Sequence, residues 1–319
     1  ISHKLEEIRA LCDGATVLRL GKVVDRCDPR EKSARELAEM MVGTMLKTPE
    51  AATREPGDVG LSLNKLSALS LNPFGTSLKG ISVEVRKGEV LGIGGVAGNG
   101  QDELLAVISG EIRTPRDAIQ MAGKGIGDMG PNARRKAGLL AAPEERLGHA
   151  AAPDMSLVEN AVLSGHVRME MVQNGFIDWG KARGFADAVI KSFDVRTPGA
   201  GNAARSLSGG NLQKFVIGRE LLQKPDVFVV NQPTWGVDAS AAAAIRQAIL
   251  DLAGEGAAVI VISQDLDELM EISTRFAALN EGRLSPPRPA AGLTIEEIGL
   301  MMGGAHGMEV AHIDEGVTP

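Results

Sequence analysis

Ser208, Gly209 and Gly210 have the residue types and the position of a phosphate-binding site. After them, apolar residues recur at the three- and four-residue spacing of a helix up to Leu222, and Pro225 ends the pattern. These three residues, the Ser-Gly-Gly motif, would therefore begin a helix, where free backbone amides and the helix dipole bind phosphate. A short glycine-rich start of a helix is more often a simple cap. The residues that follow must therefore distinguish a cap from a phosphate-binding site.

A buried strand follows the predicted helix. Its residues are Val227–Val230, and Asn231, Gln232 and Asp238 come after it. This order and spacing resembles the signature and Walker B region of the ATP-binding cassette (ABC) ATPases. The resemblance implies that the Ser-Gly-Gly motif contacts a nucleotide and that Asp238 lies in the loop facing the opposite domain. Asp238 could also be the N-cap of the next helix, and the two roles are compatible.

A second stretch has the spacing of a P-loop. The apolar strand 90–94 leads directly into residues 95–102, which read GVAGNGQD, and then into a helical run. This is the context of the motif G-x-x-x-x-G-K-[ST], whose glycine backbone cradles phosphates. A tight strand-to-helix turn without a ligand is the alternative. For nucleotide binding we single out six residues of this glycine loop: Gly95, Gly98, Asn99, Gly100, Gln101 and Asp102.

The residues that ATP hydrolysis needs are replaced in this cassette. Gln101 stands where the motif has the phosphate-binding lysine, and Asp102 stands at the Mg²⁺-binding serine or threonine. Asn231 and Gln232 replace the Asp-Glu pair that would orient Mg²⁺ and polarise the attacking water. Gln264 stands where the family has a switch histidine for the γ-phosphate. We therefore expect ATP and Mg²⁺ to bind weakly or not at all here, with no certain metal ligand and no useful hydrolysis.

The chain repeats itself at an offset of 261 residues without a gap. The matching pairs are Ile1 and Ile262, Leu5 and Leu266, Glu7 and Glu268, Leu18 and Leu279, Gly21 and Gly282, Met40 and Met301, and Gly43 and Gly304. His3 aligns with Gln264, so the resemblance implies that His3 is the switch histidine of a first cassette whose catalytic site is incomplete here. Chance similarity of two short segments is the alternative, and a lone histidine is more often a surface or capping residue.

These observations divide the chain into four parts. We expect the end of a first cassette at 1–43, a linker at 44–60, a second and degenerate cassette at 61–304 and a disordered tail at 305–319. The resemblance implies an α/β fold of the P-loop NTPase type. It would have a mainly parallel core sheet, an antiparallel β subdomain and a helical subdomain at about 144–222.

A charged run follows the predicted strand 139–142. It contains Glu144, Glu145 and Arg146 and lies in what the resemblance makes the Q-loop region. A solvated turn is the plain interpretation of such a run. We favour contact with the edge of the nucleotide or with a membrane domain, because charged loops often carry function.

Composition limits the classes of partner. The net charge is −7 and no basic block stands out, which argues against nucleic acid. No apolar run reaches the length of a membrane span, so any membrane role is expected to be peripheral. The two cysteines, Cys12 and Cys27, indicate a reducing compartment rather than a disulfide framework.

The resemblance covers residues 1–304 and is strongest to the tandem-cassette ATP-binding subunits of bacterial sugar or nucleoside importers. It implies a subunit on the cytoplasmic face of the inner membrane, docked to permease subunits and served indirectly by a substrate-binding protein. The family hydrolyses ATP, but we expect this chain alone to be inactive. Its Ser-Gly-Gly motif would serve the ATP of the first cassette, in the same or another chain. The alternative is a non-catalytic regulatory module that binds a nucleotide or a protein with an ABC fold.

Overall fold

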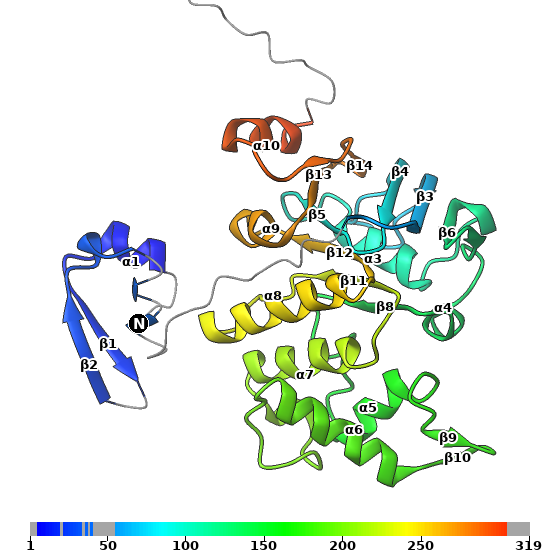
Figure 1. Ribbon diagram of the computed structural model, residues 1–319, viewed down its shortest axis with the longest axis horizontal. Helices are drawn as coiled ribbons and strands as arrows, with labels where there is room; N and C mark the ends of the chain where they lie inside the picture. The colour runs from blue at the N-terminus through cyan, green and yellow to red at the C-terminus, as the bar shows by residue number, and fades with distance from the viewer. Residues whose placement is uncertain (1–4, 20–21, 34–35, 38, 41–54, 305–319) are drawn as a thin grey trace, which may run out of the picture.

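The computed structural model describes residues 5–19, 22–33, 36–37, 39–40 and 55–304 (Figure 1). His3, the predicted tail at 305–319 and most of the predicted linker lie outside these residues. Within the described part of the chain, no helix is both long enough and apolar enough to cross a membrane.

A mainly parallel sheet forms the centre of the cassette. Its strands are β5 (Val90–Gly94), β8 (Leu139–Ala142), β11 (Val227–Asn231), β12 (Ala258–Ser263), β13 (Arg275–Asn280), β14 (Arg283–Leu284) and β15 (Arg288–Pro289). They are ordered β14-β13-β5-β12-β11-β8, with β15 paired to β13, and the pairs from β13 to β8 are parallel. Both faces of β5, β11 and β12 are buried, which explains why their sequences are continuous apolar runs.

An antiparallel sheet packs beside this core. It contains β3 (Val59–Ala68), β4 (Leu78–Arg86), β6 (Ile119–Met121) and β7 (Lys124–Gly125), in the order β4-β3-β6-β7. Leu61, Ile81 and Ile119 lie in one apolar cluster with Leu91 and Ile260 of the parallel sheet. Because β3 begins at Val59, it takes in the last two residues of the predicted linker.

Helices surround the parallel sheet and position its loops. They are α3 (Gln101–Ser109), α4 (Pro131–Ala137), α8 (Ala239–Gly254), α9 (Leu266–Ile272) and α10 (Ile295–Met302), with a short 3₁₀ turn η2 (Arg116–Ala118). The glycine loop joins β5 to α3, so the strand and the helix fix its two ends.

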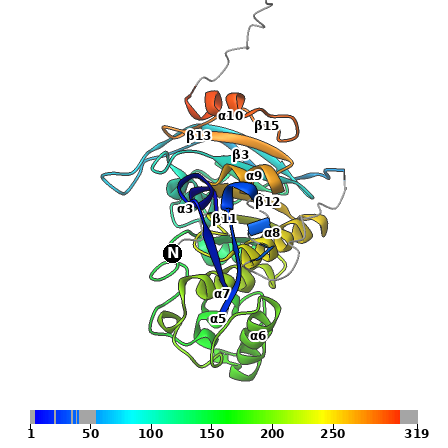
Figure 2. The ribbon, with the colours of Figure 1, turned by 90° about the vertical axis from the view of Figure 1, so that its left-hand side faces the viewer.

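The helical subdomain lies at one end of the cassette (lower part of Figures 1 and 2). It contains α5 (Leu157–Gly165), α6 (Trp179–Ser192), α7 (Gly209–Leu221), the 3₁₀ turn η3 (Ala204–Ser206) and a short hairpin of β9 (Val172–Gln173) and β10 (Phe176–Ile177). Ser156 and Glu159 form a capping box that starts α5. The α6 side chains Phe185 and Val189 lie four residues apart on one face of the helix and are buried in the core.

The N-terminal segment has its own elements: α1 (Leu5–Leu11), β1 (Ala15–Arg19), β2 (Lys22–Cys27) and the 3₁₀ turn η1 (Pro29–Glu31). At the offset of 261, α1 coincides with α9, β1 falls within β13 and β2 begins where β14 begins. The Ser33 hydroxyl accepts from the Glu36 amide at 3.1 Å, and the matching Thr294 hydroxyl accepts from the Glu297 amide at 3.2 Å. The repeat in the sequence is therefore also a repeat of secondary structure.

Candidate functional site

The glycine loop has the backbone of a P-loop-like turn. Gly100 is the N-cap of α3 with a φ of 109°, a left-handed conformation that favours glycine. Gly95 is buried, and a Cβ there would lie 2.5 Å from the carbonyl oxygen of Leu279. Of the six predicted residues, Gly95, Gly98, Asn99 and Gly100 thus lie between β5 and α3, and Gln101 and Asp102 begin α3.

Gln101 folds back onto the loop that it follows. Its Nε2 donates to the carbonyl oxygen of Val96 at 2.9 Å, and its Oε1 accepts from the amide of Asn99 at 2.9 Å. The Asn99 side chain also bonds within the loop region, because Nδ2 donates to the Val96 carbonyl at 3.0 Å. Gln101 is only 8% exposed. The Gln101 side chain thus accepts a hydrogen bond from a backbone N–H of this turn. In a P-loop the backbone N–H groups of the same turn bind phosphate.

Asp102 and Asn231 contact each other at the two predicted Mg²⁺ positions. Asn231 Nδ2 donates to Asp102 Oδ1 at 3.0 Å. Partial burial is the largest influence on Asp102 and raises its pKa, the negative charge of Glu103 raises it further, and the bond from Asn231 opposes both.

This pair does not fit a tightly bound Mg²⁺. That ion takes oxygen ligands in a near-octahedral arrangement, whereas Asn231 turns its amide nitrogen towards the carboxylate. In the described ranges, no group of three or more His, Cys, Asp or Glu side chains is placed to hold a metal ion.

The two glutamines at the predicted catalytic positions differ in exposure. Gln232 is 4% exposed, with a φ of 53°, and its Oε1 lies 3.3 Å from the hydroxyl of Ser263. That hydroxyl donates to the carboxylate of Glu268 at 2.8 Å, and burial raises the pKa of Glu268. Gln264 is exposed just beyond β12. Neither amide can act as a base.

The Ser-Gly-Gly motif is accessible at the N-terminus of α7. Ser208 is the N-cap residue, but its side chain does not cap the helix and instead accepts from Asn211 Nδ2 at 2.8 Å. Ser208 and Gly209 are exposed. Asp238, by contrast, is an N-cap whose carboxylate accepts from the amide of Ala241 at 2.9 Å. The N-cap role that the sequence offered as an alternative for Asp238 is confirmed.

Sequence reasoning missed a link between α7, the helix that begins at the motif, and the turn after β11. Arg146 Nε donates to Gln213 Oε1 at 3.0 Å, and Arg146 Nη2 donates to the carbonyl oxygen of Trp235. Gln213 Nε2 donates to the carbonyls of Gln232 at 3.1 Å and Pro233 at 2.9 Å. In the sequence, the charged run 144–146 was the signal available for this link, but the residues that Arg146 contacts lie far along the chain.

A cavity of about 710 Å³ lies against Asp102, Glu144, Arg146, His149, Gly209 and Trp235. Burial, and next the charge of Asp102, raise the pKa of Glu144. His149 pairs with Glu111, with Nε2 3.0 Å from Oε2. The carboxylates of Asp102 and Glu144 would repel a polyphosphate in this cavity.

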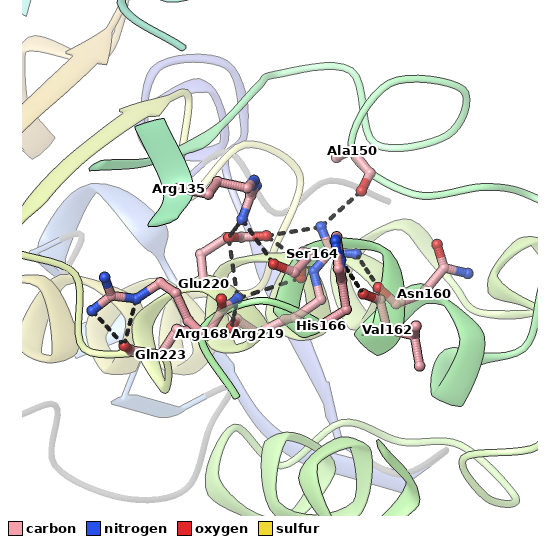
Figure 3. A network of polar contacts seen from close by, with 10 residues as sticks. All are labelled: Arg135, Ala150, Asn160, Val162, Ser164, His166, Arg168, Arg219, Glu220 and Gln223. Atoms are coloured by element: carbon pink, nitrogen blue, oxygen red, sulfur yellow. Dashed lines mark hydrogen bonds and ion pairs between the residues drawn. The ribbon is translucent and has the colours of Figure 1, made fainter. Parts of the chain in front are cut away.

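A buried ionic network holds the helical subdomain together (Figure 3). Glu220 is fully buried and accepts from Arg135 Nη1 at 2.7 Å and from Arg219 Nε at 3.0 Å. Arg219 also donates to the carbonyl oxygens of Ala150 at 2.8 Å and Asn160 at 3.1 Å. The network therefore connects α4, α5, α7 and the segment that follows the charged run.

Comparison with known proteins shows which kind of domain this chain carries. A family model described as "ABC transporter" matches residues 78–235. The nucleoside import ATP-binding protein NupA of Lactococcus lactis is 36% identical over 96% of this chain and 60% of that protein. The glucose import ATP-binding protein TsgD13 of Haloferax volcanii is 37% identical over 95% and 56%. The guanosine import ATP-binding protein NupO of Bacillus subtilis is 34% identical over 92% and 58%. The chain thus spans less than two thirds of the length of these relatives.

Solved structures confirm the predicted fold class. An ATP-binding subunit of an ABC transporter superposes with a TM-score of 0.62 at 18% identity, covering 76% of this chain and 99% of the other. The dimeric post-hydrolysis state of the cassette MJ0796, bound to ADP and Pi, gives a TM-score of 0.61 at 20% identity, covering 73% and 100%. At these identities the likeness concerns the fold. The family match over residues 78–235 and the sequence relatives show that this chain carries the ATP-binding domain of an ABC transporter.

Proposed function

We propose that the chain is part of the ATP-binding subunit of an importer for simple sugars or nucleosides. Relatives named for nucleoside, glucose and guanosine import support this assignment. On this proposal the chain lies peripherally on the cytoplasmic face of the inner membrane. Permease subunits are its direct partners, and a substrate-binding protein acts through them.

Within that subunit, the described cassette gives its Ser-Gly-Gly motif to a nucleotide held by another cassette. The main support is a difference between the two elements that could bind phosphate. Gln101 fills the glycine loop of the cassette, whereas Ser208 and Gly209 stay exposed at an N-terminus that no side chain caps. A free helix N-terminus is ready for phosphate, and the filled loop is not.

The other cassette is the first copy of the repeat. Residues 1–43 form its end, and His3 is its switch histidine. The matching helix, hairpin and cap pairs at the offset of 261 support this part of the proposal. ATP and Mg²⁺ act at the first cassette, because Asp102 and Asn231 do not offer a fitting metal site in the second.

Ser208→Ala tests this division of labour. ATP turnover is measured with a chain in which a complete first cassette precedes residue 1. Loss of the hydroxyl removes a phosphate contact, so we expect kcat to fall about tenfold or more. Ser206→Ala is the matched control, because the Ser206 hydroxyl bonds the Ala203 carbonyl before the motif. Unchanged turnover in Ser208→Ala would contradict the proposal.

The filled glycine loop also favours a second candidate, a non-catalytic nucleotide- or protein-binding module with an ABC fold. If the chain had that function, a chain with both cassettes would turn over ATP no faster than the described cassette alone. The same turnover assay therefore separates the two functions before any substitution is made.

A further inference from the structure

Arg146 lies where the charged run, the Ser-Gly-Gly motif and the turn after β11 (residues 232–236) meet. We propose that Arg146 is a positioning residue for the nucleotide that the motif contacts, because it holds the motif and this turn in one fixed arrangement. The inference rests on the proposed function. It assigns Arg146 no contact with the nucleotide itself.

The guanidinium group of Arg146 fills the space between two glycines. A Cβ on Gly209 would lie 2.7 Å from Arg146 Nη1, and a Cβ on Gly236 would lie 3.0 Å from Nη2. Larger residues at either position would push the guanidinium away. The side chain thus packs directly against the backbone of the motif on one side and of the turn on the other.

Two polar side chains complete the link. Arg146 donates to Gln213 in the second turn of α7 and to the carbonyl of Trp235 in the turn. Gln213 is 1% exposed and donates to the carbonyls of Gln232 and Pro233 at the start of the same turn. Arg146 therefore bonds both α7 and the turn, and Gln213 bonds both Arg146 and the turn.

The backbone that carries Arg146 is also fixed to α7. The amide of Ala151 donates to the Arg146 carbonyl at 2.8 Å, and Arg219 donates to the carbonyl of Ala150 at 2.8 Å. Gln213 and Arg219 lie nearly two turns apart on α7, so the helix holds this segment at two points. Arg146 consequently stays aligned with the helix that begins at the Ser-Gly-Gly motif.

The geometry requires an arginine rather than a positive charge alone. The planar guanidinium presents several N–H groups in a fixed fork, so it reaches Gln213 and Trp235 together. A lysine ammonium is a point charge on a flexible stem and cannot hold the same arrangement. A positional error of about 1 Å at a reacting site can cost about 100-fold in rate.

The expected effect falls on turnover rather than on ATP affinity. The glycine loop of the first cassette would set most of the binding, whereas the motif would act when the two cassettes close. Loss of an interaction made in the transition state lowers kcat and leaves KM nearly unchanged. Arg146→Ala and Arg146→Lys should each lower kcat about tenfold or more, with the KM for ATP within about twofold.

The test uses the chain with both cassettes and measures kcat, KM and amide hydrogen exchange of residues 232–237. Gln213→Ala should match Arg146→Ala, and the double variant should be no slower than either single variant, because both remove one link. Exchange should quicken in all three. Arg205→Ala, an exposed neighbour of the motif paired with Asp154, is the control and should keep the normal kcat.

The outcomes separate this inference from the proposed function. If Ser208→Ala lowers kcat while Arg146→Lys turns over normally, or while the Arg146 and Gln213 effects multiply, the positioning role of Arg146 is wrong and the proposed function stands. If Ser208→Ala has no effect, the proposed function itself fails. Since Arg146→Lys keeps the charge and most of the volume, it remains informative even if Arg146→Ala does not fold.

Discussion

Asn231 donates a hydrogen bond to the carboxylate of Asp102 across 3.0 Å, from the end of β11 to the first turn of α3. In P-loop NTPases the corresponding places hold the hydroxyl of the P-loop and the carboxylate of the Walker B strand, which together hold Mg²⁺. Here the carboxylate of Asp102 lies on α3 and the amide of Asn231 lies on β11, and the two side chains are hydrogen-bonded to each other. The two side chains thus form an internal contact between β11 and α3.

Gln101→Ala should strengthen nucleotide binding by this chain. The substitution frees the amide of Asn99 and the space over Gly95, so phosphate can enter the glycine loop. One recovered hydrogen bond is worth about 1 kcal/mol, or about a fivefold gain in ATP affinity by calorimetry. Gln173→Ala, on the exposed hairpin strand β9, is the control. Weaker binding in Gln101→Ala would instead make Gln101 a nucleotide ligand.

Glu220→Gln should strongly destabilise the fold. The carboxylate is fully buried and pairs with both Arg135 and Arg219, which lose their counter-charge in the variant. Breaking a buried ion pair costs about 3–5 kcal/mol in the free energy of unfolding, measured by urea denaturation. Glu255→Gln removes an exposed pair with Lys224 and should cost less than about 1 kcal/mol. Equal losses in both variants would show that the network contributes no special stability.

His149 should give the cassette a pH-dependent contribution to stability. Its bond to Glu111 raises the His149 pKa above 6.5, against the opposing effect of burial, and lowers the Glu111 pKa below 4.5. The contribution is complete between these ordinary values. It is lost as pH rises through the raised His149 pKa, and also as pH falls through the lowered Glu111 pKa.

This contribution is measured by comparing the free energy of unfolding of the unsubstituted chain with that of His149→Gln. The loss of unfolding free energy should be greatest at about pH 5.5 and should vanish once the pH exceeds the raised pKa of His149. It should not exceed about 1 kcal/mol, because the two side chains are 39% and 41% exposed. Glu111→Gln should show the same pH profile. A loss that is constant across this range would mean that the ion pair contributes nothing.

Local patterns predicted much of the fold. The apolar runs gave β5 and β8 with their observed bounds, because strands buried on both faces need continuous apolar residues. The capping box of Ser156 and Glu159 that starts α5 is also local, because the two residues are only three positions apart. In contrast, residues 110–136, which contain β6, β7 and most of α4, gave no clear pattern because their elements are short and broken by Gly and Pro.

For the glycine loop, the sequence predicted the place between a strand and a helix but not the side-chain contacts. Spacing located the glycine loop, yet it could not show that Gln101 turns back to the Val96 carbonyl. The bond from Arg146 to Gln213 spans 67 residues, and that from Arg135 to Glu220 spans 85. Such pairs depend on how the helical subdomain meets the sheet, which no local periodicity records.

The location of the triphosphate tests the central claim most directly. It can be determined in a structure, with bound Mg-ATP, of a chain in which a complete first cassette precedes residue 1. We predict a triphosphate on the glycine loop of the first cassette, in contact with Ser208 and Gly209, while Gln101 keeps its bonds to Val96 and Asn99. A triphosphate held by residues 95–102, with Ser208 facing solvent, would contradict the account.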